Sequence, residues 1–424
     1  MSNAAPFSTR RPTDWATPAM QSRVRRRYRA ERRFRLLGLA AVTLSGAFLL
    51  FLLGSMLLRG AGGFLETRVA MPIDFARASL DVDPRRLQGR AADLALAGAG
   101  LEGAVDDAAV AAFGPDLGGR ILSDGAWLRV REAIKDDPSV LSRRVVMSLP
   151  VASPIDVAAK GPGSVEAEAV VASLRSGDLL STGLNREFLL SADSTDPTRA
   201  GIWGALKGSI LTMLVTLLLA FPIGLLAALY LEEYAPKNRW TDLIEVSINN
   251  LAAVPSIIFG LLGLALFLGT FGLPRSAPLV GGLTLALLTM PVIVIASRNA
   301  IKAVPPSIRD AALGVGASPI QVVFHHVLPL ALPGILTGTI IGMARALGET
   351  APLLMIGMRA FIAAPPDGIT DPATVLPVQV FLWSDEVGRG FVEKTSAAIV
   401  VLLVFLLAMN ALAIHLRNRF ETRW

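Results

Sequence analysis

Two oppositely charged residues, Arg345 and Glu349, lie four positions apart in one of the most apolar stretches of this 424-residue chain, within ARALGETAPLL (344–354). A spacing of four places both side chains on one face of a helix, where they can form an ion pair. A charged group inside a membrane segment is costly, and such groups usually face the interior of a helix bundle and mark the path of a polar solute. The alternative is a buried ion pair that only locks this helix to a neighbour.

Other polar residues of the apolar blocks are candidates for the same path. Asn249 and Asn250 lie in a second apolar stretch, INNLAAVPSIIFGLLGLAL, and Thr350 directly follows Glu349. We group all three with the charged pair, although hydrogen bonding between helices explains the asparagines equally well. His325 and His326 are adjacent, so their side chains diverge on a helix, and no metal site is predicted there.

The composition limits the chemistry further. Hydrophobic residues make up 53% of the chain and charged residues 17%, whereas soluble domains have about a quarter of their residues charged. The absence of cysteine excludes disulfides, thiolate metal sites and cysteine nucleophiles. The chain also lacks a G-x-x-x-x-G-K-[ST] loop, which excludes an ATPase of the P-loop type.

Apolar segments of about 20 residues can cross a bilayer as helices. Six such segments are present, at residues 36–58, 208–231, 243–269, 277–296, 330–357 and 397–416. They predict an all-α integral membrane protein with six transmembrane helices, of which the last five form a core over 202–416. Pro222, Pro255 and Pro291 fall inside the second, third and fourth segments and are expected to kink these helices.

The charge distribution predicts the orientation of these helices. Residues 1–36 contain ten arginines and two acidic residues, so the positive-inside rule places the N-terminal segment 1–35 in the cytoplasm. Nucleic-acid binding is the alternative for the arginine run, but no interleaved aromatic residues support it. Six crossings return the tail 417–424 to the cytoplasm and leave the loop 298–329 on the same side.

Residues 60–200 are polar and are predicted to form a small α+β domain outside the cytoplasm, inserted after the first helix. In TRVAMPIDF, the apolar residues from Val69 to Phe75 alternate as in a half-buried strand, and RRVVMSLPV repeats the pattern. The segments 85–100 and 125–137 between them are predicted helices. The scattered acidic residues fit a solvated surface, and neither a metal cluster nor a catalytic cluster is recognised.

The loop 298–329 carries more local structure than a simple connection needs. Ser307 and Asp310 have the spacing of a capping box, which predicts a short helix that ends at a left-handed Gly316. Ser318 and the proline after it predict the start of a second helix. That helix is expected to end at the last residue of the loop, which is also a proline.

This loop resembles the EAA loop of ABC importer permeases. The residues that carry the resemblance are Asp310, Ala311, Ala312, Gly316, Leu328 and Pro329. Aspartate stands in place of the usual glutamate at position 310, and His326 stands in place of the usual isoleucine. In that family the short helix docks in a cleft of the ATPase subunit and transmits its closure to the membrane helices. The resemblance implies the same role for these residues.

A second resemblance covers residues 202–424 and the first span. INNLAAVPSIIFGLLGLAL and ARALGETAPLL are similar to segments of the A-type permeases of phosphate-specific ABC importers, and Ala351-Pro352 is typical of the A-type chain. The resemblance implies a type I ABC permease that forms half of a pore for inorganic phosphate in the cytoplasmic (inner) membrane. It also implies the partners: a second permease chain, a pair of ATP-binding subunits and an extracytoplasmic phosphate-binding protein.

On this interpretation the chain is a transport subunit and not an enzyme, with no catalytic residue, metal or cofactor of its own. The guanidinium of Arg345 offers a fork of donors that matches phosphate oxygens. Glu349 can accept a hydrogen bond from phosphate, which keeps hydroxyl hydrogens at neutral pH, whereas sulfate has none to donate. The alternatives are an importer of another oxyanion or small solute, and a membrane receptor, which would need an output domain that is absent after residue 416.

Overall fold

The computed structural model describes residues 17–78, 80, 82 and 89–420, so the outermost residues of both predicted cytoplasmic ends lie outside the described residues. The chain divides into two units, residues 1–56 and 57–424. The described part of the first unit is helical and belongs to α1 (Pro18–Ala61). This helix contains the predicted span 36–58, and its apolar side chains are exposed.

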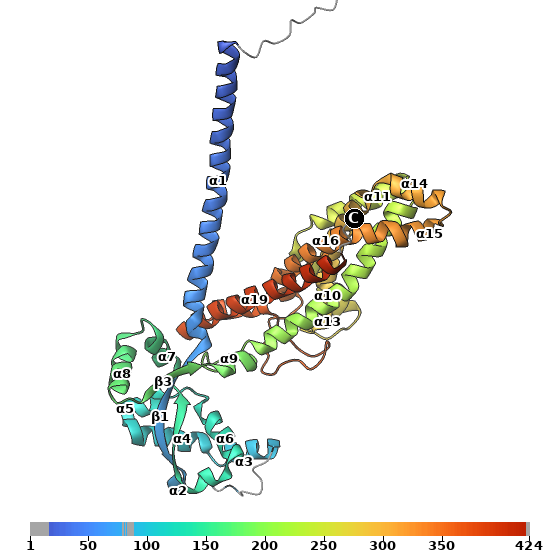
Figure 1. The fold of residues 1–424 in the computed structure, drawn as a ribbon. Helices are drawn as coiled ribbons and strands as arrows, with labels where there is room; N and C mark the ends of the chain where they lie inside the picture. The colour runs from blue at the N-terminus through green and yellow to red at the C-terminus, as the bar shows by residue number, and fades with distance from the viewer. Residues whose placement is uncertain (1–16, 79, 81, 83–88, 421–424) are drawn as a thin grey trace, which may run out of the picture. The chain divides into compact units, whose positions relative to one another are not determined.

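Four further helices in the described part of the chain are long and apolar enough to cross a membrane. They are α10 (Trp203–Leu229), α13 (Pro278–Lys302), α16 (Leu328–Gly348) and α19 (Arg389–Phe420). Figure 1 shows them as a bundle in which α13 packs on α10 and α16, and α19 packs on α16. The glycines let the backbones approach, since a Cβ on Gly282 of α13 would lie 2.5 Å from Val215 of α10. The all-α membrane fold is confirmed.

The prediction of one kinked helix for the third span, 243–269, is wrong, because the structure has two separate helices there. The structure has α11 (Arg239–Ala252) and α12 (Ser256–Gly263), the latter continued by a π-helical turn, Leu264–Thr270. The two helices are bent by 99° at the break between them. Pro255 causes the break, because it has no N–H to donate and it disfavours the helical conformation of the residue before it. Pro222 and Pro291 remain inside continuous helices.

The fifth predicted span, 330–357, is also interrupted. Helix α16 ends at Gly348, Glu349 has an extended backbone, and a short helix α17 (Ala351–Met355) follows. Pro352 lies four residues after Gly348, so it cannot donate a hydrogen bond to that carbonyl, and its ring would clash with it in a continuous helix. The apolar composition of this segment continues past a break that the proline imposes.

The predicted α+β insert contains a three-stranded antiparallel sheet with the order β2-β1-β3. Its strands are β1 (Leu65–Asp74), β2 (Arg144–Pro150) and β3 (Leu180–Leu184). The predicted alternation in β1 is confirmed, because Val69, Met71 and Ile73 are all buried in the core of the insert. The outer strand β3 was not predicted from the sequence, since only five residues form it and they lack a clear apolar alternation.

Short helices cover the sheet and connect the insert to the bundle. They are α2 (Phe75–Ala78), α3 (Gly89–Gly98), α4 (Leu101–Phe113), α5 (Pro115–Ile121), α6 (Ala126–Asp136), α7 (Ser153–Lys160), α8 (Val165–Ser176) and α9 (Arg186–Leu190). The predicted helix 125–137 corresponds to α6, and the predicted helix 85–100 corresponds in its described part to α3 and the turn after it.

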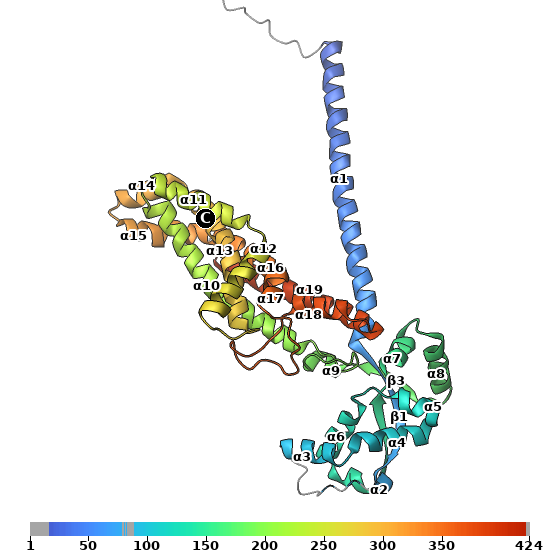
Figure 2. The same ribbon diagram turned by 180° about the vertical axis from the view of Figure 1, so that it is seen from behind.

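The insert is joined to the start of α19 by a buried lysine. Nζ of Lys160 lies 2.6 Å from Asp156 and 2.8 Å from Glu393 of α19, and it donates a hydrogen bond to the carbonyl of Gly62. Figure 2 shows α7, which carries Lys160, against the start of α19. Beside it, Lys394 donates to the carbonyl of Gly63 and lies over the ring of Phe188. The insert and the last helix of the bundle therefore share one ion-pair network.

Replacing Lys160 by methionine should loosen the insert from α19. The change leaves the carboxylates of Asp156 and Glu393 in a mostly buried site without their cation, at a cost of about 3 kcal/mol or more. We expect the insert of the solubilised complex to be digested by protease at a lower temperature. The control is Lys135→Met, which removes a lysine from an ion-pair group at the edge of the insert. Equal effects of the two changes would contradict the role of Lys160.

Candidate functional site

The charged pair lies at the break between α16 and α17. Nε of Arg345, in the last turn of α16, is 3.4 Å from Oε1 of Glu349, with the arginine side chain 50% and the glutamate side chain 18% exposed. The predicted contact is confirmed, but the prediction that one helix face carries both residues is wrong, because Glu349 follows the end of the helix. Arg345 has no other hydrogen bond among the described residues, so most of its donors are free for another acceptor.

The break at Glu349 lies next to the start of α12. A Cβ on Gly260 of α12 would lie 2.6 Å from Cα of Pro352, and one on Gly263 would lie 3.2 Å from Ile356, so α12 and α17 run side by side in the same direction. Gly260 lies one turn after Ser256, the first residue of α12, and Pro352 is the second residue of α17. The beginning of α12 therefore packs beside the beginning of α17, which follows the break at Glu349.

The remaining pathway candidates flank the same two breaks. Asn249 and Asn250 are exposed in the last turn of α11, just before the bend into α12. Thr350 is half-buried at the start of α17, where its carbonyl accepts a hydrogen bond from Leu354. The structure thus locates all five candidates at interruptions of helices, where backbone groups as well as side chains can meet a solute.

The first helix of the loop 298–329 is α14 (Pro306–Gly314). The capping box predicted for Ser307 is wrong: Pro305 occupies the cap position and no side chain caps the helix, because the fixed backbone of two successive prolines already starts it. The end of the helix follows the prediction. Gly316 has φ +90°, and Ala317 N–H donates to the carbonyl of Ala312, as in a Schellman motif.

The second helix of the loop starts as predicted and ends later than predicted. Ser318 and Gln321 form a reciprocal capping box at the start of α15 (Pro319–Val322). A π-helical turn, Val323–Val327, then leads directly into α16, so Pro329 does not end a helix. The π-helical turn shifts the backbone hydrogen bonds by one residue just before Pro329. Such a shift lets a helix continue through a proline, which has no N–H to donate.

The outer surface of this loop carries both small residues and large apolar side chains. Asp310, Ala311 and Gly316 are exposed, whereas Ala312 is buried against the bundle and Leu328 is half-buried. The same loop exposes large apolar residues: the exposed fractions of Leu313, Val315, Ile320 and Phe324 are 49%, 85%, 59% and 47%. We call these four side chains, with Asp310 and Ala311, the coupling surface. Exposed large apolar side chains gathered in one short loop are typical of a protein-binding site.

Behind α14 lies an ion-pair network that was not predicted from the sequence. Arg298 pairs with Glu232 and, at 2.7 Å, with Glu245, and Nη2 of Arg309 lies 2.7 Å from Glu233. Arg309 also donates to carbonyls at the end of α13. The signal for the pairing of these arginines was the Glu232-Glu233 pair directly after the second apolar segment.

This network ties α14 to the ends of α10, α11 and α13, and it lies far from the insert. Helix α10 begins at Trp203, close to α9 and the insert, and ends in the turn that carries Glu232 and Glu233. Figure 1 accordingly shows α14 and α15 at one end of the bundle and the insert at the other. A protein bound at the coupling surface and one bound at the insert would contact opposite ends of the same helices.

Comparison with known proteins identifies the family. Residues 220–423 match the model of the binding-protein-dependent transport system inner membrane component. Over 213 residues the chain is 30% identical to the phosphate transport system permease protein PstA of Haemophilus influenzae, with 50% of this chain and 74% of that protein covered. This chain belongs to the PstA-like family of type I ABC permeases. It is therefore a multi-pass membrane component of a transport system.

Other relatives match more closely over shorter stretches. The chain is 34% identical over 172 residues to the probable ABC transporter permease protein YqgI of Bacillus subtilis and 36% identical over 156 residues to PstA 1 of Mycobacterium tuberculosis H37Rv. These matches cover 40% and 37% of this chain, and 58% and 50% of the respective relatives. The chain thus spans about half the length of the first relatives it matches.

Two further matches cover other parts of the chain. Residues 21–169 match a domain of unknown function, DUF3333. An inward-facing structure of the MetNI methionine ABC transporter aligns with 52% of this chain and 98% of its own, at 19% identity and a TM-score of 0.42.

Gly316→Val should impair the coupling loop without impairing insertion into the membrane. A β-branched residue is strained at a φ of +90°, at a cost of roughly 1 kcal/mol or more. We expect the ATPase subunit to bind less well in a pull-down from detergent, and transport to fall. Gly314→Val is the matched control, because Gly314 has no positive φ and, like Gly316, has open space around it. Wild-type association of the Gly316 variant would contradict a coupling role for this cap.

Proposed function

We propose that this chain is the permease subunit of an ABC importer that moves inorganic phosphate across the cytoplasmic membrane, driven by ATP hydrolysis on a partner. The observation that carries the proposal is the position of Arg345. Its guanidinium is half-exposed at a helix break, has one carboxylate contact at 3.4 Å and otherwise free donors. Relatives named as phosphate permeases support the choice of solute.

The arrangement of the two helix breaks is suited to an oxyanion. Free guanidinium donors can bind two phosphate oxygens at once, and Glu349 can accept a hydrogen bond from a phosphate hydroxyl. The start of α12, which packs beside α17, adds backbone N–H groups to the surroundings. Sulfate could use the guanidinium but has no hydrogen to donate to the carboxylate. Phosphate should therefore be preferred over sulfate, and another oxyanion remains the alternative substrate.

The exposed surfaces account for the proposed partners. The coupling surface is the proposed contact of an ATP-binding subunit, and the ion pairs of Arg309 with Glu233 would carry its movement into α10 and α13. The exposed apolar residues of α11 would face a second permease chain, since one chain supplies only half of the helices around a pore. An extracytoplasmic phosphate-binding protein would deliver the solute from the side of the insert.

The insert is proposed to lie outside the cytoplasm, with both chain termini inside. The arginine-rich segment before the first span supports this orientation, as does the separation of the insert from the coupling surface along the bundle. Protease added to spheroplasts should therefore cut within 60–200 and leave the loop 298–329 intact. Cleavage of the insert only in inverted vesicles would contradict this topology.

Arg345→Gln should abolish most phosphate uptake while the complex still assembles. The amide cannot replace the charged fork, and we expect uptake into proteoliposomes to fall at least about tenfold, the equivalent of one lost charge-assisted hydrogen bond. Glu349→Gln should lower uptake less and weaken the discrimination against sulfate. The matched control is Arg275→Gln, an exposed arginine outside the bundle core.

A double variant separates a pathway role from a structural one. Replacing Arg345 by methionine and Glu349 by leucine keeps similar volumes and removes both charges. If the pair only held helices together, transport would survive, because exchanging an ion pair for apolar groups is often neutral for stability. The proposal expects an assembled complex that does not transport phosphate. Near-normal uptake in this variant would overturn it.

A further inference from the structure

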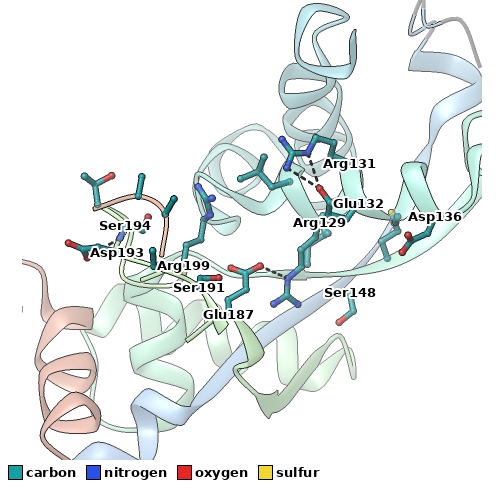
Figure 3. Close-up of a pocket in the computed structure, with 18 of the residues that line it drawn as sticks. Arg129, Arg131, Glu132, Asp136, Ser148, Glu187, Ser191, Asp193, Ser194 and Arg199 are labelled. Carbon is teal, nitrogen blue, oxygen red and sulfur yellow. Dashed lines mark hydrogen bonds and ion pairs between the residues drawn. The ribbon is translucent and has the colours of Figure 1, made fainter. Parts of the chain in front are cut away.

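A large groove lies where the insert meets the loop that follows α17. Its volume is about 980 Å³. Figure 3 shows that side chains from α6 and β2 line one wall, and that Ser191, Asp193, Ser194 and Arg199 come from the segment between α9 and α10. The opposite wall contains Phe361, Ala363, Ala364 and Pro365 of the bundle. The groove is thus formed jointly by the insert and by the permease core.

The insert wall of the groove includes a free sheet edge. Strand β2 has only β1 as a neighbour in the sheet. Ala70 of β1 pairs in register with Ser148, but its N–H donates to Leu179 on the other side of β1. In an antiparallel ladder this alternation means that the N–H and C=O of Ser148 face away from β1. Among the described residues, neither the N–H nor the C=O of Ser148 has a backbone hydrogen-bond partner, so this edge of the sheet can accept another strand.

The side chains around this edge are suited to a polypeptide. Val146 of β2 is 69% exposed and Phe361 on the facing wall is 53% exposed, with two small alanines beside it. An extended chain added to a sheet edge gains main-chain hydrogen bonds, and alternate side chains enter apolar pockets. The groove offers both features within one space.

The charges of the groove argue against a simple anion site. The lining holds four carboxylates and three arginines. Arg129 is already paired with Glu66 and Glu187, and Arg131 with Glu132. The carboxylate of Asp193 accepts hydrogen bonds from Ser194 and Trp383. Among the described residues, the side chains of Arg199 and Asp136 have neither an ion-pair nor a hydrogen-bond partner. One free cation and one free carboxylate suit a peptide, which carries both kinds of group, better than a phosphate ion.

Both walls of the groove are held in place. The N–H of Asp193 donates to the carbonyl of Ile362, and its carboxylate accepts a hydrogen bond from Trp383 of the core at 2.9 Å. The facing wall belongs to the chain that leaves the break at Glu349 through α17. A protein seated in the groove would therefore contact a segment that begins 12 residues after Glu349 in sequence.

We propose that an extended segment of the extracytoplasmic phosphate-binding protein adds to the free edge of β2 in this groove. The inference rests on the proposed function and extends it, because it assigns the insert a part in receiving that partner. The family matched by the core is binding-protein-dependent, and the groove lies at the end of the bundle opposite the coupling surface. It is also continuous with the chain segment that leads to the proposed pathway.

Ser148→Pro tests the free edge with little disturbance of the sheet. The change removes an N–H that faces the groove and no ladder hydrogen bond to β1. In the reconstituted complex, the concentration of phosphate-loaded binding protein that half-saturates ATPase stimulation should rise about fivefold, while unstimulated ATPase activity stays unchanged. Thr182→Pro is the matched control: Thr67 accepts a hydrogen bond from Val151, so the N–H of Thr182 on the other outer strand also faces away from β1.

A cross-linking experiment decides the matter if the proline variant fails to assemble. The chain has no cysteine, so Val146→Cys provides a unique attachment point for a benzophenone probe in the groove. Light should link the probe to the binding protein, and the same probe at Thr182→Cys should not. Equal half-saturation in the two proline variants, or a link from position 146 only to a second copy of this chain, would overturn the inference.

The two levels of the proposal fail in different ways. If the wild-type complex takes up phosphate with a binding protein but the Ser148 and Val146 experiments are negative, only the docking site is wrong. If the wild-type complex neither transports phosphate nor responds to a phosphate-loaded binding protein, the proposed function itself is wrong, and the docking site with it.

Discussion

The hydrocarbon core of a membrane supplies no hydrogen-bond partner for a free backbone amide and no solvation for a charge. A chain that crosses it must therefore be helical throughout or must interrupt its helices where other protein segments or a polar cavity surround the break. In this protein the interruptions occur at Pro255 and Glu349, and the helices that follow them, α12 and α17, pack directly against each other. The charged pair lies at one of these breaks. A single polar surrounding can therefore stabilise both the two charges and the backbone groups that the broken helix leaves without partners.

The same constraint places the other charges at the ends of the bundle. At one end, Arg298 and Arg309 pair with glutamates of neighbouring helices and fix α14 to them. At the other end, Lys160 and Lys394 hold the insert to α19 and to the chain that leaves α1. Removal of one partner from such a buried pair costs more than the pair contributes. Both ends should therefore move with the helices to which they are tied.

This arrangement connects the insert mechanically to the core. It is not tethered by a long flexible linker, since only three residues separate α1 from its sheet and Lys160 pairs with Glu393 of the last helix. The groove formed with the loop after α17 extends the core surface and does not stand apart from it. A partner bound there and an ATP-binding subunit bound at the coupling surface would act on opposite ends of α10 and α13.

The sequence by itself determined the apolar spans, the position and α+β class of the insert, and the local signals of the coupling loop, such as the left-handed Gly316. These features depend on composition, periodicity and short-range backbone preferences, which are properties of neighbouring residues. Only the tertiary structure decided that Pro255 and Pro352 break helices while Pro222 and Pro291 do not, that Glu232, Glu233 and Glu245 pair with the loop arginines, and that β2 keeps a free edge. Each of these outcomes depends on what packs against the segment, and residues as far apart as Lys160 and Glu393 meet only when the whole chain has folded.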